Sequence, residues 1–587
     1  MSSTSRLLSY IKKHPFYLIS SLICALIYVI SMVLIPLING KMVDVIKNMV
    51  MDGSFNKHLD SFIYFIIIDV VLVVLVIIFQ FVFDFIVNVF VEGINKEIRD
   101  DLFIKLNGVN IKFIDSHAHG DLVSRCVTDC ENVNNALISG FKQFYQGIIQ
   151  ILTTLIIMFL FNWILGLVVI VLTPISFLIS YFVAKKSKKY FTAQAKIAGD
   201  MSATVLEDFN NIDIIKSFNY ENEALNDYQN QNEKFYKAGQ KSQFVSSWTN
   251  PSTRLINNST YALVGMIAAI LCAVSVNSGN MLLGASCTVG SILTFLQYSN
   301  QFAKPFNEIS SCLTEIQNGV SSLKRINEVL NEPNDIDEGT YEINEEVKTI
   351  KFENVYFSYE PNQKLIENFD LEVKQGQKIA IVGPTGCGKT TIINLILRFY
   401  DSVNGKILFN GVSNRCIKKS SLRSQFGMVL QDTWIFHGTV LENIKYAKSD
   451  ATMEEVQEAA LRANALNFIN RLPKGFNTMI SDNSGLSVGE KQLICIARVM
   501  LCEPKIMILD EATSNIDTRA ELKISSAFNK MMTGKTSFVI AHRLSTIKNS
   551  DLILVMNKGH IVEIGNHNDL LDKKGFYYDL YNAQYSY

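Results

Sequence analysis

Six long apolar segments lie within the first 310 residues of this chain, and no comparable segment follows them. A helix needs about 20 apolar residues to cross the hydrocarbon core of a bilayer. Inside that core each backbone polar group must be satisfied within the segment, so such segments fold as helices. The first half of the chain is therefore predicted to be a bundle of six transmembrane helices. They cover residues 16–38, about 62–91, about 144–161, about 163–183, about 261–276 and about 289–309.

The first segment could also belong to a secretory signal peptide, because Lys12 and Lys13 precede it. A signal peptide has an apolar region of about 7–15 residues, followed by a cleavage site of small residues. The segment is longer than that and no such site follows it, so we expect it to be retained as a transmembrane helix.

Lysine and arginine are concentrated in two of the connections between these segments. The connection after the second segment includes Lys96, Arg99, Lys105, Lys112 and Arg125, and the connection after the fourth holds nine lysines, whereas the loops on the other side hold only Lys41, Lys47 and Lys57. Basic connections stay in the cytoplasm. We therefore expect a multi-pass protein of the cell membrane, with both termini cytoplasmic. The two basic connections, of about 50 and 75 residues, exceed ordinary loops of about 4–6 residues and should extend the helices into the cytosol.

The sequence changes character after the sixth segment. An acid-rich stretch without an apolar face, residues 330–346, is interpreted as a linker between a membrane domain (1–329) and a soluble domain (347–587). In the soluble part, short β-branched runs alternate with helical stretches, which is typical of an α/β domain. Strands are predicted at 377–382, 505–509 and 536–540, and a hairpin at 551–565 that turns at Asn557, Lys558 and Gly559.

Charge and cysteine content exclude two further classes. The formal net charge of -1 argues against a broad basic surface, so we expect no nucleic-acid partner. The ten cysteines are scattered and several lie in apolar segments, so we expect them to be reduced rather than paired in a disulfide framework.

A glycine-rich segment follows the first predicted strand and has the pattern G-x-x-x-x-G-K-[ST]. It consists of Gly383, Pro384, Thr385, Gly386, Cys387, Gly388, Lys389 and Thr390, with Thr391 continuing into helical sequence. Glycines let backbone N–H groups converge on phosphate oxygens, and the new helix presents its positive end. Lys389 would supply positive charge to the β- and γ-phosphates, and the Thr390 hydroxyl can bind Mg²⁺. The soluble domain is therefore predicted to be an α/β P-loop ATPase that takes ATP and Mg²⁺.

Two acidic residues, Asp510 and Glu511, follow the strand at 505–509. Ligands of open α/β sheets bind at the carboxyl ends of the strands. Asp510 is predicted to hold the Mg²⁺ shell, and Glu511 to orient and deprotonate the attacking water. Such a pair can also be a capping or surface feature, but the P-loop upstream favours the catalytic interpretation.

The chain resembles the ABC exporters along almost its whole length, specifically half-transporters with an N-terminal membrane domain and a C-terminal ATPase domain. Residues 486–490 (LSVGE) are similar to the family signature, in which Ser487 and Gly489 offer donors to the γ-phosphate. Further matches are Gln431, similar to the glutamine that links the nucleotide and its metal to the membrane domain; His542, similar to the histidine that senses the γ-phosphate; residues 514–517, similar to the loop beside the partner site; and Tyr359, similar to the ring that stacks on adenine.

The resemblance implies that two ATPase domains bind head to tail, with each ATP between the P-loop of one chain and the signature of the other. ATP binding would close the pair and hydrolysis would reopen it, so that the membrane cavity faces each side in turn. Residues 113–125 and 211–218 lie where the family places the cytoplasmic elements that transmit this movement, the second of them on the partner's ATPase domain.

The signature departs from the common LSGGQ, because Val488 replaces a glycine and Glu490 replaces the glutamine. A carboxylate close to ATP is unfavourable, unless Glu490 turns to solvent and changes little. Asymmetric exporters combine an intact catalytic acid with an altered signature. A second half-transporter in a heterodimer is therefore favoured over a homodimer.

Polar residues inside the predicted spans bear on the substrate. They are Asp69, Gln80, Asp84 and Asn88 in the second, and Gln297, Gln301, Lys304 and Glu308 in the sixth. Intramembrane ionisable groups usually face a cavity or a partner, which predicts an exporter of small amphipathic or hydrophobic molecules. Helix packing explains several of them equally well. A flippase for membrane lipid or lipid-linked molecules, an importer, and a non-transporting ATP-gated channel or sensor stay as alternatives, although Glu511 and His542 disfavour the last.

One P-loop residue has a chemical prediction of its own. Cys387 lies at the start of a helix and beside Lys389, and both features lower a thiol pKa. The sequence therefore predicts a reactive thiolate, with a packed and inert thiol as the alternative.

Overall fold

The structure is a computed structural model that describes residues 2–53, 55–161, 163–278, 288–360, 363, 365–430, 433–482, 485–510, 518–541 and 544–585. The chain divides into two compact units. The first, the helical unit, consists of Met1–Gly108 and His117–Pro333. The second, the ATPase unit, consists of Val109–Ser116 and Asn334–Tyr587. The predicted membrane bundle plus α/β P-loop domain is confirmed.

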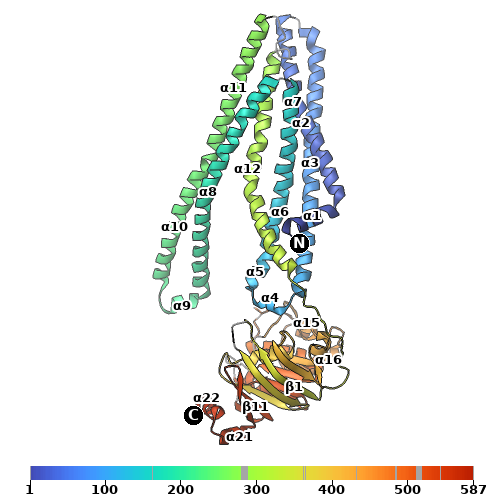
Figure 1. Cartoon of the computed structure of the whole chain (residues 1–587), viewed down its shortest axis with the longest axis vertical. Helices are drawn as coiled ribbons and strands as arrows, with labels where there is room; N and C mark the ends of the chain where they lie inside the picture. The colour runs from blue at the N-terminus through green and yellow to red at the C-terminus, as the bar shows by residue number, and fades with distance from the viewer. Residues whose placement is uncertain are drawn as a thin grey trace. The chain divides into compact units, whose positions relative to one another are not determined.

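Long helices occupy all six predicted spans (Figure 1). They are α2 (Pro15–Met51), α3 (Phe55–Gly108), α7 (Gln146–Phe161), α8 (Trp163–Asn210), α11 (Thr249–Ser278) and α12 (Val289–Asn331). Several are far longer than a bilayer needs, and that these extensions lie in the cytosol stays a prediction. Among the described residues, three stretches are apolar and long enough to cross a membrane by length and composition: Pro15–Met51, Phe55–Gly108 and His119–Leu160.

Further helices complete the helical unit. They are α1 (Ser3–Lys13), α5 (His119–Ser124), α6 (Cys130–Ser139), α9 (Ile212–Ser217) and α10 (Glu221–Ser247). Two π-helical turns, η1 (Arg125–Asp129) and η2 (Gly140–Tyr145), interrupt the helix that leads into α7. Turns of this kind are frequent at functional sites, and no pattern in the sequence predicted them.

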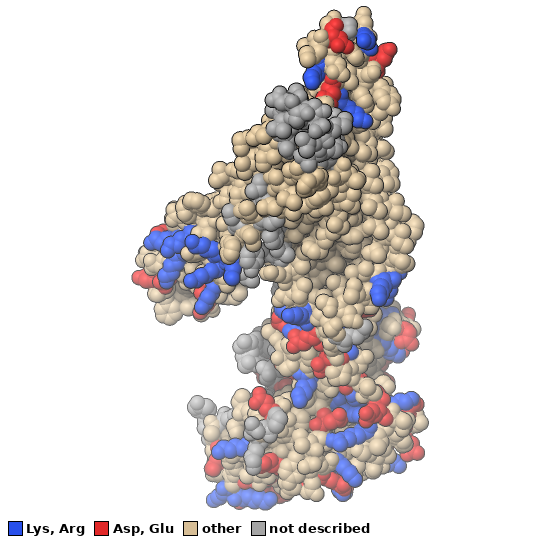
Figure 2. Space-filling model, turned by 45° about the horizontal axis from the view of Figure 1, so that its top comes forward, with Lys and Arg blue, Asp and Glu red and all other residues tan. Residues whose placement is uncertain are grey.

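The outer surface of the helical unit is apolar, as a lipid-facing surface must be. Figure 2 shows an uncharged band along its middle, with basic residues gathered at the end formed by α8, α9 and α10. Its interior is packed as well, and includes Val29, Phe295 and Tyr298. The Tyr298 hydroxyl donates to the Val33 carbonyl over 2.8 Å, which satisfies its one buried polar group.

The ATPase unit contains a six-stranded sheet in the order β12, β11, β3, β10, β9, β6, parallel except for β12. The strands are β3 (Lys378–Val382), β6 (Phe426–Val429), β9 (Ile506–Asp510), β10 (Thr536–Ile540), β11 (Leu552–Asn557) and β12 (His560–Gly565). The predicted strands and hairpin are confirmed, and the hairpin turns through Lys558 and Gly559, both with positive φ.

A second, antiparallel sheet has the order β2, β1, β4, β5. Its strands are β1 (Thr349–Phe357), β2 (Ile366–Lys374), β4 (Asn404–Phe409) and β5 (Val412–Ser413). A two-stranded sheet pairs β7 (Gly438–Thr439) with β8 (Met479–Ile480). The helices of this unit are α4 (Ile111–Asp115), α13 (Lys389–Ile396), α14 (Lys419–Arg423), α15 (Val440–Lys445), α16 (Met453–Arg462), α17 (Leu466–Ile469), η3 (Gly475–Asn477), α18 (Val488–Cys502), α19 (Thr518–Met532), α20 (Leu544–Lys548), α21 (His567–Asp572) and α22 (Phe576–Tyr585).

The parallel strands are apolar on both faces, as strands covered on both sides are. Along β3, Ile379 and Ile381 join the core beneath the antiparallel sheet, whereas Ala380 and Val382 join the core beneath helices such as α18 and α19. The sheet is thereby fixed from both sides, and its carboxyl edge becomes a rigid support for the loops that follow the strands.

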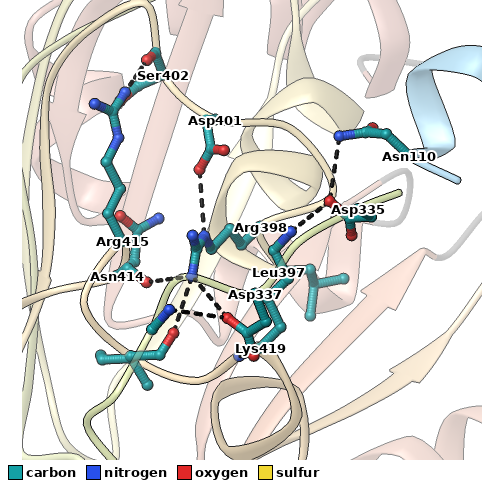
Figure 3. Close-up of polar contacts among 12 residues, drawn as sticks. Asn110, Asp335, Asp337, Leu397, Arg398, Asp401, Ser402, Asn414, Arg415 and Lys419 are labelled. Atoms are coloured by element: carbon teal, nitrogen blue, oxygen red, sulfur yellow. Dashed lines mark hydrogen bonds and ion pairs between the residues drawn. The ribbon is translucent and has the colours of Figure 1, made fainter. Parts of the chain in front are cut away.

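The predicted linker is held against the ATPase unit from Asn334 onward (Figure 3). The ammonium of Lys419 donates to Asp335, and its backbone N–H donates to Asp337 Oδ2 over 2.7 Å. Buried Arg398 lies 3.6 Å from Asp337 Oδ1. Two acidic residues of the predicted linker, Asp335 and Asp337, thus pair with basic residues of the ATPase unit.

A segment from the long connection after α3 also belongs to the ATPase unit. It is residues 109–116, which contain α4. The Asn110 side-chain amide donates to Asp335 over 3.4 Å, Phe113 is buried, and the Tyr400 hydroxyl donates to Asp115 over 2.5 Å. The segment 113–125 that was predicted to transmit movement is therefore divided, with α4 on the ATPase unit and α5 on the helical unit.

Candidate nucleotide-binding site

The carboxyl ends of three parallel strands meet at one edge of the six-stranded sheet. In the strand register, Ile540 of β10 lies opposite Ile381 of β3 and opposite Asp510 of β9. Asp510 is thus at the level where β3 passes into the P-loop, two strands away. This is the arrangement that the sequence predicted for an acidic residue serving a bound nucleotide.

The glycines of the P-loop adopt backbone conformations that other residues rarely take. Gly383 has φ +155°, and a Cβ there would lie 2.3 Å from the Met556 carbonyl oxygen and 2.8 Å from Cys387 Sγ. Gly386 and Gly388 also have positive φ, at +81° and +102°. The hairpin strand β11 therefore closes against the loop, and the glycines give it the tight curvature that a phosphate cradle requires.

Lys389 lies at the first position of α13, and its ammonium turns back over the loop. It donates to the carbonyl oxygens of Gly383 and Pro384, over 2.9 and 3.1 Å. These contacts hold a positive charge above the exposed residues Pro384, Thr385 and Gly386. A polyphosphate on the loop would meet this charge together with the amino end of α13.

Cys387 differs from the prediction of a reactive thiolate. Its side chain is only 3% exposed and packs in the core beneath the antiparallel sheet. Burial raises the pKa of the thiol, and the nearby Lys389 only partly opposes that shift. The prediction was wrong because sequence position shows the helix start and the lysine, but not the desolvation, which favours the neutral thiol.

Tyr359 lies beside the P-loop helix. Its hydroxyl is 3.3 Å from Thr391 Oγ1 and accepts from the Asn394 side chain over 3.1 Å. Its ring meets the rings of Phe357 and Tyr400 edge to face, at centroid distances of 4.9 and 5.0 Å. The side chain is anchored next to the loop, while its stacking on adenine stays a prediction.

The signature residues open α18. Ser487 is the N-cap, exposed, and Gly489 is buried in the first turn. Glu490 Oε2 accepts from the Ser487 backbone N–H over 2.9 Å and from its hydroxyl over 3.1 Å, and Ser487 Oγ accepts from the Glu490 N–H over 3.2 Å. This reciprocal capping box satisfies the helix end with the chain's own carboxylate. Glu490 therefore turns back onto the signature serine rather than into solvent.

Three predicted catalytic residues, Gln431, Glu511 and His542, lie outside the described residues, as does the loop 514–517. The described strands that precede them in sequence, β6, β9 and β10, all end at the same sheet edge. Their roles stay predictions.

The oxygen donors at this edge suit Mg²⁺. Thr390 is exposed on the first turn of α13, and Asp510 ends β9 at the same level of the sheet. Carboxylate and hydroxyl oxygens are the hard ligands that Mg²⁺ takes beside nucleotide phosphates. These two residues, with Gln431 as a third expected donor, fit the ion together with ATP.

Polar residues in the membrane helices form two groups. Gln146 donates to Gln80 over 3.0 Å, joining α7 to α3. Gln150 donates to the Gln301 carbonyl over 3.1 Å, and Gln301 in turn donates to the Met32 carbonyl over 3.1 Å. These amides fit the alternative of helix packing.

The ionisable side chains of the second group are partly exposed. Asp84 lies 3.3 Å from the ammonium of Lys142 in η2, and Lys304 lies 3.7 Å from Glu308 within α12. The two side chains of the first pair are 37% and 27% exposed, so the pair is not sealed between helices.

Sequence reasoning missed the hydrogen bond between Tyr400 and Asp115. The two residues are 285 positions apart, and each alone reads as an ordinary surface or core residue. The signal available was indirect: the segment 113–125 was singled out as a transmitting element, and its acidic residues needed donors.

Comparisons with known proteins cover most of the chain. Residues 18–306 match the family described as ABC transporter transmembrane region, and residues 366–514 match the family described as ABC transporter. The fatty acid ABC transporter ATP-binding/permease protein of Mycobacterium bovis is 37% identical over 499 residues, which are 85% of this chain and 78% of that protein.

Two further similarities extend this comparison. A probable multidrug resistance ABC transporter ATP-binding/permease protein of Bacillus subtilis is 32% identical over 493 residues, 83% of this chain and 72% of that protein. The solved structure of a bacterial Atm1-family ABC exporter with ATP bound has a TM-score of 0.79 at 25% identity and covers 97% of this chain and 98% of its own.

Proposed function

Because the chain belongs to the ABC transporters, as a half-transporter in which a membrane domain is fused to an ATP-hydrolysing domain, we propose that it exports small amphipathic or hydrophobic molecules across the cell membrane. The observation that carries the proposal is the partly exposed Asp84–Lys142 pair, with Asp84 in the second predicted span and Lys142 just before the third. Ionisable groups in or beside membrane spans usually face a cavity or pair with one another, so this pair supports a polar environment between the spans. An amphipathic molecule offers both a polar group for the pair and an apolar part for the helices.

ATP would drive the cycle through the edge of the six-stranded sheet. Lys389 and the P-loop backbone bind the phosphates, Tyr359 takes the adenine, and Thr390, Asp510 and Gln431 hold Mg²⁺. Bound by these residues, the ion would supply charge stabilisation to the phosphates. Glu511 orients and deprotonates the attacking water, and His542 contacts the γ-phosphate.

The proposed working unit is a heterodimer with a second half-transporter. In the capping box, the Glu490 carboxylate accepts the donors of Ser487 that the family uses for the partner's γ-phosphate. A phosphate at the amino end of α18 would have to displace this carboxylate or lie beside it, and like charges at short range are costly. An arrangement with only one such site avoids imposing that cost on both ATP molecules.

A vesicle experiment tests the transport proposal. The purified protein, with its candidate partner, is reconstituted and loaded with ATP, and dye flux is measured together with phosphate release. We expect flux that depends on ATP and stops in Glu511→Gln. Phosphate release without flux of any amphipathic dye would contradict the export proposal and favour a flippase. Movement of a headgroup-labelled lipid across the bilayer would then test that alternative. Flux without turnover would indicate a channel.

A further inference from the structure

In the ion pair between Asp84 of α3 and Lys142 of η2, the carboxylate is held by more contacts than the ammonium. Asp84 Oδ2 accepts from the Gln80 side chain over 3.0 Å, and Gln80 is itself held by Gln146. The carboxylate is thus fixed on both oxygens. Lys142 has only the Asp84 contact among the described residues, at 3.3 Å, longer than the usual 2.7–2.9 Å of a charge-assisted hydrogen bond.

The backbone places Lys142 in an unusual position. It lies within the π-helical turn η2, between the end of α6 and the start of α7. The direction of the Lys142 side chain is therefore set by a wider helical turn, next to the start of the third predicted span. Its neighbour Gln146, one residue past the turn, is buried, so the turn separates a packed amide from an accessible ammonium.

Resting on the proposed function, we propose that Lys142 is the residue that binds the headgroup of the substrate, and that the substrate is an anionic amphiphile such as an alkyl carboxylate. Two ammonium N–H groups are free of described protein partners, and they match the oxygens of a carboxylate. Asp84 holds the lysine in place when no substrate is bound, and it competes with the substrate for the same ammonium.

This competition gives a prediction that a merely structural ion pair does not make. If the pair only braces α3 against η2, removing either partner weakens the same brace, and both variants lose function together. If Lys142 binds the headgroup, Lys142→Met loses the ligand contact, whereas Asp84→Asn removes a competing anion. The two variants should then act in opposite directions.

The test uses the full-length protein in proteoliposomes, with its partner, and three probes of equal chain length: laurate, dodecanol and dodecyltrimethylammonium. Binding of labelled probe and stimulation of ATP turnover are both measured. Lys142→Met should weaken laurate binding about tenfold or more, because a charge-assisted hydrogen bond is lost. It should leave dodecanol unchanged, and Lys142→Arg should restore laurate. Asp84→Asn should tighten laurate binding.

The matched control is Lys13→Met, which removes another lysine of an ion pair, 2.9 Å from Glu97; it should shift no probe. Equal weakening by Lys142→Met and Asp84→Asn, for laurate and dodecanol alike, would overturn the headgroup role while leaving amphiphile export standing. Selective binding of dodecyltrimethylammonium that is lost in Asp84→Asn would replace it with a cationic substrate. Failure of all three probes in the unaltered protein would instead count against the proposed function.

Discussion

At the scale of single residues, different side chains at the carboxyl edge of the six-stranded sheet are expected to bind ATP and to hydrolyse it. Lys389 lies on the P-loop, whereas Glu511 follows the Mg²⁺ candidate Asp510 in sequence. Glu511→Gln should keep ATP binding and lower turnover by about 100-fold or more, since it removes a general base. Lys389→Ala should instead weaken binding itself. Nucleotide binding and phosphate release, measured on the same preparations, distinguish the two, and near-normal turnover in Glu511→Gln would refute the assigned role.

Cys387 gives a residue-scale prediction that is opposite to the one from sequence alone. Because burial raises its pKa, less thiolate is present at neutral pH, and maleimide labelling should be slow. The rate should keep rising as the pH passes the ordinary thiol range, because deprotonation of the folded site is displaced upward. Single-cysteine variants allow a direct comparison with the exposed Cys416 as control. Labelling of Cys387 as fast as that of Cys416 at neutral pH would contradict the buried state.

At the scale of elements, one of the contacts that tie α4 to the rest of the ATPase unit is a side-chain hydrogen bond. The Tyr400 hydroxyl donates to Asp115, and the Tyr400 ring contacts Tyr359 beside the P-loop helix. Tyr400→Phe should keep the packed ring and lower the free energy of unfolding by about 1 kcal/mol, or about 2–4 °C in melting temperature. Basal ATP turnover should stay within about twofold, while its stimulation by substrate falls.

The control for this variant is Tyr446→Phe, because Tyr446 is an exposed ring of the same unit. It should change neither melting temperature nor stimulation. Full substrate stimulation in Tyr400→Phe would mean that α4 responds to nucleotide through other contacts.

Elements with a local cause were predictable. The strands of the parallel sheet are short apolar runs, and the P-loop pattern fixes its own glycine conformations, so both could be predicted from the sequence. Contacts between distant segments could not. The linker from Asn334 onward and the segment 109–116 belong to the ATPase unit. Their residues Asp335, Asp337 and Asp115 accept hydrogen bonds there, from donors that are remote in sequence. For Glu490, the sequence left open whether the carboxylate lies close to ATP or turns to solvent, and it did not indicate the hydrogen bonds to Ser487.

At the scale of the whole molecule, the capping box of α18 bears on assembly. If two copies of this chain formed the working unit, each ATP would meet a signature whose Ser487 donors are already taken by Glu490. A heterodimer leaves this chain's own P-loop, Asp510 and Glu511 facing a partner signature that has no such carboxylate. The partner should then lack an equivalent of Glu511, giving one hydrolysing site and one that mainly holds ATP.

This arrangement predicts that the purified chain alone hydrolyses ATP at least about tenfold more slowly than the chain co-expressed with its partner. In the lone chain, Glu490→Gln should raise turnover, because the neutral amide keeps the cap geometry and removes the repulsion, a change of about 1.4 kcal/mol for each factor of ten. In the heterodimer the same substitution should leave turnover nearly unchanged, since it alters only the site that holds ATP. Glu442→Gln is the matched control, because Glu442 forms the same type of capping box with Thr439 on α15. Full turnover by the lone chain, unaltered by Glu490→Gln, would require the asymmetric assembly to be abandoned in favour of a homodimer.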